Sequence, residues 1–163
     1  MVVDKSETND TNMATSSAQI GSSTAWAAGY TGAGSKVAVI DTGIDYEHQS
    51  FSAEGYNYSM QLNAEKAGIS LDAYKAKVGV LTKADLTDEV LAQLNVQVTA
   101  DKVYLNDKIP FAYNYIDKSY TVDHLHDAQG EHGSHVEGIA AANAYIPNGD
   151  GTFSSALEKV QVQ

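Results

Sequence analysis

Two histidines near the C-terminal end of the chain have a spacing that could support chemistry. They lie in GEHGSHVEGIAA, where His132 and His135 are three residues apart and stand next to glycines. The residues alone leave three interpretations open. The pair could be ordinary surface histidines at the start of a helix, metal ligands, or part of a catalytic apparatus.

A metal site would join this pair to His124, His126 or Asp127. Two histidines one helical turn apart can chelate zinc, but zinc peptidases typically place a glutamate between histidines spaced i, i+4, and this sequence lacks that pattern. The chain also has no cysteine, which excludes thiolate ligands, cysteine nucleophiles and disulfides. We therefore assign no metal ligand, and a His-rich metal-binding domain stays as an alternative function.

A catalytic interpretation joins His132 to Asp41. The apolar run VAVI at residues 37–40 predicts a strand buried on both faces, and Asp41 follows it directly in DTGID. The carboxyl ends of strands line the ligand crevice of open α/β sheets. A carboxylate there can hold an imidazole in one tautomer, ready to take a proton from a nucleophile. The other interpretation is that Asp41 only caps the turn, in which Gly43 supplies backbone freedom.

Other elements follow from the spacing of apolar residues. Residues 59–79 and 82–95 carry apolar residues at helical intervals, with Gly68 weakening the first helix and Thr87 as an N-cap in the second. DKIPFAYNY, at residues 107–115, alternates as a strand does, and its proline indicates a sheet edge.

The stretch that begins at His132 predicts a further helix. His135, Val136, Ile139 and Asn143 would share one side of it with His132. Gly138 would let this helix approach a neighbour closely.

Composition excludes several kinds of partner. The net charge is −11 with only ten Lys and Arg, so we expect no binding to nucleic acid or to an anionic membrane surface. No apolar stretch is long enough to cross a bilayer. Residues 1–24, rich in Ser, Thr, Asn and Asp, predict a polar N-terminal arm without a signal-peptide pattern.

The two motifs together resemble the subtilisin-like serine peptidases, or subtilases. VAVIDTGID and, later, EHGSHVEGIAA are similar to the family's sequences around its catalytic aspartate and histidine. NDKIPFAYNYIDK resembles the segment before that histidine in the cell-envelope and C5a-peptidase-like branch. The resemblance covers roughly residues 25–163, the N-terminal part of a catalytic domain. It implies an α/β fold with a mostly parallel sheet flanked by helices, here incomplete at the C-terminus.

The resemblance also implies roles for single residues. Asp41 would orient and stabilise the imidazolium of His132, which would act first as general base and then as general acid. Ser134 stands two residues after His132 on a helix and is not expected to be the nucleophile. Five residues are expected to shape the site: Gly43, Gly133, Ser134, His135 and Gly138.

The sequence departs from the family pattern in several places. It has no G-T-S-M-A-like stretch and no oxyanion-hole asparagine, so we expect no nucleophile and no activity from this chain alone. Residues 48–51 read His-Gln-Ser-Phe where compact members have His-Pro-Asp-Leu, whose aspartate binds calcium. We therefore expect no cofactor and no calcium here. Glu137 replaces a residue that is usually small, and it should point away from the pair, roughly 140° around the helix.

The expected organisation and function follow. Residues 1–24 form the arm and residues 25–163 the catalytic part, with a helical insertion at about residues 56–107. The expected function is that of a secreted or cell-surface serine endopeptidase acting on proteins or peptides, with a partner segment that carries the serine. A pseudoprotease or interaction module without catalysis is the alternative.

Overall fold

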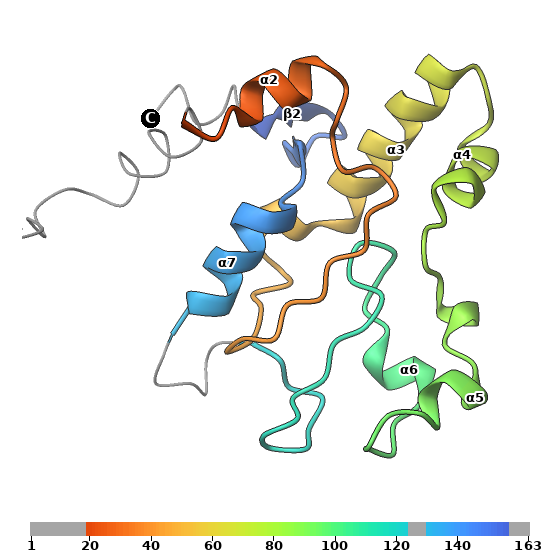
Figure 1. Cartoon of the computed structure of the whole chain (residues 1–163), viewed down its shortest axis with the longest axis vertical. Coiled ribbons are helices and arrows are strands. Elements are labelled where there is room, and N and C mark those ends of the chain that lie inside the picture. The colour runs from red at the N-terminus through yellow and green to blue at the C-terminus, as the bar shows by residue number, and fades with distance from the viewer. Residues whose placement is uncertain (1–18, 124–129, 157–163) are drawn as a thin grey trace, which may run out of the picture. The chain divides into compact units, whose positions relative to one another are not determined.

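The structure is a computed structural model that describes residues 19–123 and 130–156 (Figure 1). The chain divides into two compact units, Met1–Ser35 and Lys36–Gln163. The first unit contributes helix α2 (Ser22–Ala27), which begins after Gly21 in the left-handed conformation. Most of the predicted N-terminal arm lies outside the described residues.

The second unit is mainly helical. Its helices, in chain order, are η1 (Gln49–Phe51), α3 (Ala53–Ala67), α4 (Leu71–Val78), η2 (Lys83–Asp85), α5 (Asp88–Leu91), α6 (Ala100–Val103) and α7 (His132–Ala141). The predicted N-cap at Thr87 is confirmed, since its side chain accepts a hydrogen bond from the Val90 amide. Gly68 does more than weaken a helix: in the left-handed conformation it ends α3, and Ser70 then caps α4.

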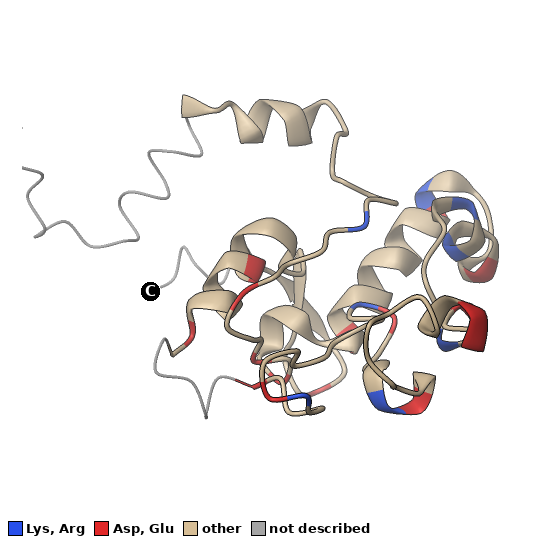
Figure 2. Cartoon of the chain, turned by 60° about the horizontal axis from the view of Figure 1, so that its bottom comes forward, with Lys and Arg blue, Asp and Glu red and all other residues tan. Residues whose placement is uncertain are grey.

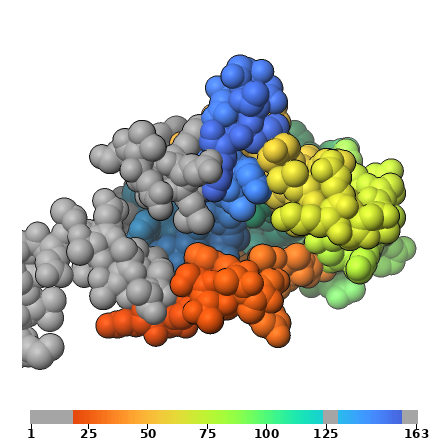
Figure 3. Space-filling view, turned by 90° about the horizontal axis from the view of Figure 1, so that it is seen from above, coloured from red at the N-terminus to blue at the C-terminus, as the bar shows by residue number. Residues whose placement is uncertain are grey.

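A short hairpin packs against α3. Strand β1 (Tyr145–Pro147) pairs antiparallel with β2 (Phe153–Ser155). Tyr58 of α3 stacks on Phe153 at 4.2 Å between ring centroids and meets Tyr145 edge-on at 5.1 Å. Gly55 allows this approach, because a Cβ there would lie 2.3 Å from the Tyr145 carbonyl oxygen. Figure 3 shows the hairpin projecting beside α3.

A small apolar core lies under the segment that follows Asp41. Ile44, Phe51 and Val122 are buried in it, and partly buried residues surround them: Tyr46, Leu105, Ile109 and Ala112. The core therefore joins the turn after Asp41 to the long segment that precedes α7.

The predicted strand at residues 37–40 is absent from the structure. Val37 is 58% exposed and Ile40 is 99% exposed. A strand needs neighbours for its N–H and C=O groups, and none of the described residues pairs with this run. The two-stranded antiparallel hairpin is the sheet that the described residues form, so the mostly parallel sheet implied by the resemblance is not seen among them.

Residues 107–115 also differ from the strand that their alternation predicts. Within them, only Asn114 makes a bridge, to Ser119 across a tight turn. Proline at position 110 has no N–H to give to a ladder. Ile109 instead packs on the core, and Tyr113 contacts Tyr115 edge-on at 5.0 Å.

Charge is spread over the helices of the second unit. Figure 2 shows few basic segments (blue), most of them on helices that also carry acidic segments (red). None of the helices formed by residues 19–123 and 130–156 is both long and apolar enough to cross a lipid bilayer.

Candidate active site

Asp41 and His132 contact each other, although 91 positions separate them. Nδ1 of His132 lies 2.7 Å from Oδ1 of Asp41. His132 is the first residue of α7, and in Figure 1 the start of this helix lies next to the orange segment that carries Asp41. The Asp41 side chain keeps 17% of its surface exposed and the His132 side chain 60%. The Asp41 side chain is thus mostly covered, although the residue as a whole is exposed, while the imidazole stays open to an approaching group.

The hydrogen bonds around Asp41 decide the protonation of the pair. Two hydrogen bonds hold the pKa of the Asp41 carboxyl below its usual value. The larger effect comes from the bond to His132, and the next from the Thr42 amide, which lies 2.8 Å from Oδ1. An ionised carboxylate only accepts hydrogen bonds, so Nδ1 of His132 carries the proton that it donates to Asp41. Nε2 is then the nitrogen with a free lone pair, which is what a general base needs.

Two further hydrogen bonds join the turn after Asp41 to the first turn of α7. The Gly133 amide donates to Oγ1 of Thr42 at 3.0 Å, and the Asp45 amide donates to Oγ of Ser134 at 2.8 Å. Ser134 therefore points to the aspartate turn, and its role in shaping the site stays a prediction. The sequence analysis did not single out Thr42, although a residue with a short hydroxyl side chain directly after Asp41 was the available signal.

Close backbone contact explains two of the predicted glycines. A Cβ at Gly133 would lie 2.1 Å from the Gly43 carbonyl oxygen. A Cβ at Gly43, where φ is 131°, would lie 2.5 Å from the Val122 carbonyl oxygen. The neighbouring Ile44 amide donates to that same oxygen at 2.8 Å. The aspartate turn is therefore enclosed between α7 and the segment at Val122, with no room for a side chain at either glycine.

The far end of α7 is also held. Asn143, which is 5% exposed, donates from its backbone amide to the Ser50 carbonyl and from Nδ2 to the Ser52 carbonyl, both at 2.8 Å. These bonds join the segment after α7 to the start of α3. They hold the chain two residues beyond the end of α7 next to the start of α3.

The remaining predicted site residues are placed differently. His135 is exposed, and its role in shaping the site stays a prediction. A Cβ at Gly138 would meet nothing within 4 Å, so the close approach expected there occurs at Gly133 instead. His124, His126 and Asp127 lie outside the described residues. In the part of the chain that the structure describes, no three His, Cys, Asp or Glu side chains form a group that could hold a metal ion.

Similarity to known proteins identifies the family. The model of the subtilase family matches residues 32–162, a range that includes both Asp41 and His132. The chain belongs to the subtilase family. The resemblance carried by the two motifs is therefore confirmed, and membership implies an α/β fold.

Three curated proteinases are similar to this subtilase chain. The PI-type and PII-type proteinases of Lactococcus lactis subsp. cremoris, and the PIII-type proteinase of its strain SK11, are each 31% identical to it over 119 residues. The alignment covers 70% of this chain, but only 5% of the PI-type and PII-type proteinases and 4% of the PIII-type proteinase. No solved structure gives a significant match.

Glu137 of α7 is a partly buried carboxyl that feels the charge of Asp41. Burial, and after it the negative charge of Asp41, raise the pKa of the Glu137 carboxyl to about 7. Its Oε2 is buried and has no hydrogen-bond partner among the described residues. The expectation that Glu137 points away from the pair stays a prediction, although the charge of Asp41 acts on its carboxyl.

Replacing Glu137 with glutamine is expected to flatten the dependence of stability on pH. The folded protein holds a proton on this carboxyl up to about pH 7, whereas the unfolded chain releases it near 4.5. The stability that this proton contributes is complete below pH 4.5 and is lost as the pH rises through 7. For a half-buried group we expect a loss on the order of 1–2 kcal/mol.

Urea unfolding at pH 5 and pH 8 would measure this effect. Glu137→Gln should lose less stability between the two pH values than the natural protein, while Glu47→Gln, at an exposed position, should behave as the natural protein does. Equal losses in the natural protein and Glu137→Gln would contradict the prediction.

Proposed function

We propose that this chain is the N-terminal part of the catalytic domain of a subtilisin-like serine endopeptidase, which hydrolyses peptide bonds by acyl transfer. The observation that carries the proposal is the 2.7 Å contact between Asp41 and His132, formed by the two motifs that resemble the family's catalytic ones. Family membership and the proteinase relatives support the same reaction class.

The geometry gives each residue a part in this reaction. Nε2 of His132 would take the proton from a serine hydroxyl as its oxygen attacks the scissile carbonyl, and would then deliver that proton to the leaving amine. Asp41, ionised and bonded to Nδ1, would stabilise the imidazolium formed between these steps. Water activated by the same imidazole would then release the acyl group.

The serine would come from sequence outside these 163 residues, since no G-T-S-M-A-like stretch lies within them. The chain alone would then be inactive. The same additional part would supply the oxyanion-hole donors and neighbours for residues 37–40, where Ile40 is 99% exposed. That pairing would make this run a strand of the mostly parallel sheet typical of the family.

Substrates and location follow from the same proposal. The substrates would be proteins or peptides, and the enzyme would act outside the cell or at its surface, as the resemblance to the cell-envelope branch implies. We propose no cofactor for this chain, because residues 48–51 read His-Gln-Ser-Phe where compact members have His-Pro-Asp-Leu, and calcium stays open only for the complete enzyme.

Labelling of the whole protein with a fluorophosphonate probe tests this function. The natural protein and a His135→Ala variant should be labelled, because His135 is not the base, while His132→Ala should lose labelling. In serine peptidases of this kind, loss of the histidine costs about a million-fold in kcat. If no variant is labelled, although all are folded and fully processed, the proposal fails and a non-catalytic interaction module becomes the better description.

A further inference from the structure

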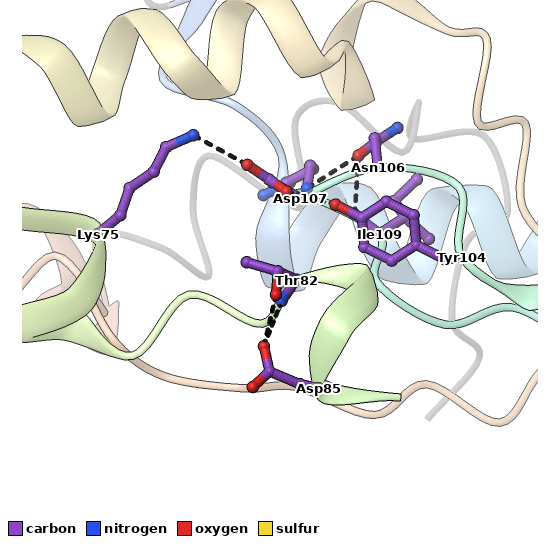
Figure 4. A network of polar contacts seen from close by, with 8 residues as sticks. Lys75, Thr82, Asp85, Tyr104, Asn106, Asp107 and Ile109 are labelled. Carbon is purple, nitrogen blue, oxygen red and sulfur yellow. Dashed lines mark hydrogen bonds and ion pairs between the residues drawn. The ribbon is translucent and has the colours of Figure 1, made fainter. Parts of the chain in front are cut away.

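The loop at residues 104–109 is held firmly by its own side chains (Figure 4). Oδ1 of Asn106 accepts hydrogen bonds from the Lys108 amide at 2.8 Å and from the Ile109 amide at 2.9 Å. Asp107 accepts one from the Tyr104 hydroxyl and another from Nζ of Lys75 on α4, the latter at 2.8 Å. The loop therefore has one defined shape, fixed to α4 at Asp107 and to the core at Ile109.

This shape carries the Lys108 side chain to the C-terminal end of α7. Nζ of Lys108 donates a hydrogen bond to the carbonyl oxygen of Ala141, the last residue of that helix. The same ammonium lies 5.6 Å from the centre of the Tyr56 ring on α3. One cation thus joins α7, α3 and the loop.

The surroundings of Lys108 favour this contact. The last carbonyl groups of a helix have no partners within it and carry its partial negative charge, so a cation there is stabilising. The face of an aromatic ring attracts the same charge. Burial lowers the pKa of the Lys108 ammonium, so the contact forms in a partly water-excluded place where it is stronger than in bulk water.

Because Ala141 is at the opposite end of α7 from His132, the bond between Lys108 and Ala141 can affect the orientation of His132. The two residues are the ends of α7, roughly 13 Å apart along a helix of this length. At the His132 end, the Gly133 amide donates a hydrogen bond to Thr42 and Oγ of Ser134 accepts one from the Asp45 amide, which fixes the distance to the aspartate turn. A tilt of α7 that starts at Ala141 would rotate the imidazole about those bonds and change the direction in which Nε2 points.

We propose that Lys108 is a positioning residue for the general base, holding α7 at its C-terminal end so that the imidazole at its N-terminal end is aimed at the substrate. This inference rests on the proposed peptidase function for its kinetic consequence, but not for its structural one. The loop at residues 104–109 would then support α7, the helix that carries the general base.

Three variants of the whole protein test it. Lys108→Met keeps the apolar stem and removes the charge and the hydrogen bond; Lys108→Arg keeps a cation that can reach the same carbonyl. Lys83→Met is the matched control, because it removes an ion pair with Asp101 that lies outside both the loop at residues 104–109 and α7. We expect kcat for a peptide substrate to fall about 10–100-fold in Lys108→Met with KM within about twofold, since misplacement by about 1 Å has such an effect. Lys108→Arg should recover most of the loss, and Lys83→Met should keep the natural kcat.

The NMR signal of the proton between Nδ1 of His132 and Asp41 provides a second measurement that needs no activity. It should shift or broaden in Lys108→Met and stay in place in Lys83→Met. If the natural protein has no activity, the proposed function fails and this signal alone decides the inference. If Lys108→Met does not fold, Tyr56→Leu replaces it, since that change removes one of the two contacts and should give a smaller effect of the same kind.

Unchanged kcat and an unchanged proton signal in folded Lys108→Met, or in Tyr56→Leu where it replaces that variant, would overturn the inference. Equal effects of Lys108→Met and Lys83→Met would also overturn it, because they would show a general response to the loss of a lysine and not one specific to the end of α7.

Discussion

Replacing Gly133 with alanine is expected to separate Asp41 from His132. The new Cβ would lie 2.1 Å from the Gly43 carbonyl oxygen and 2.9 Å from its amide nitrogen. Both are backbone atoms in a turn that is itself enclosed on its other side by Val122, so neither can rotate out of the way. The start of α7 must then move by roughly 1 Å, which would lengthen the contact between Asp41 and His132 and cost about 10²-fold in kcat.

The same displacement should lower the stability. Overpacking of this kind typically costs about 1–3 kcal/mol, and the hydrogen bond from the Gly133 amide to Thr42 would weaken as well. Thermal unfolding and fluorophosphonate labelling of the whole protein would measure the two effects.

Gly138→Ala is the matched control in the same helix. A Cβ there meets nothing within 4 Å, so alanine should be tolerated and, through its better helix propensity, could add up to about 1 kcal/mol. If Gly133→Ala were as stable and as well labelled as Gly138→Ala, the close packing of α7 on the aspartate turn would not exist.

The contrast between these two glycines shows what a sequence pattern can locate. HGSHVEGIAA predicts a helix, and α7 begins at His132 as expected. The pattern did not tell which glycine meets a neighbour, because that depends on the segment around Gly43, some ninety positions away. Local signals were more reliable: Thr87 caps a helix through an atom three residues away, a distance at which the sequence itself carries the information.

Residues 37–40 show that a prediction which depends on distant segments is less reliable than a local one. Their β-branched side chains fit a strand, but a strand forms only where another segment offers hydrogen bonds, and the described residues offer none to this run. Glu137 and Lys108 could not be placed from the sequence for a related reason. The charge of Asp41 acts on the Glu137 carboxyl, and Lys108 donates a hydrogen bond to the Ala141 carbonyl, only in the folded chain.

Asp41→Asn is expected to remove most of the peptidase activity of the whole protein while leaving the fold intact. The amide matches the carboxylate in shape, but Oδ1 of Asp41 accepts from both the Thr42 amide and Nδ1 of His132. With its oxygen at that place, asparagine keeps both bonds but carries no charge to stabilise the imidazolium. With its NH₂ group there, it loses the Thr42 bond and donates to Nδ1 of His132, which favours the tautomer with its proton on Nε2, and that nitrogen cannot accept a proton from a serine. Serine peptidases lose about 10⁴-fold in kcat through this change.

Asp45→Asn separates this effect from a simple loss of negative charge near the site. Asp45 stands in the same turn, but its bond to Ser134 comes from the backbone amide, which the substitution keeps. Steady-state hydrolysis of a peptide substrate should therefore show near-natural kcat for Asp45→Asn and an unchanged KM for Asp41→Asn. Equal losses of kcat in the two variants would mean that Asp41 acts only through its charge at a distance. A natural kcat in Asp41→Asn would mean that its 2.7 Å contact with His132 has no part in the reaction.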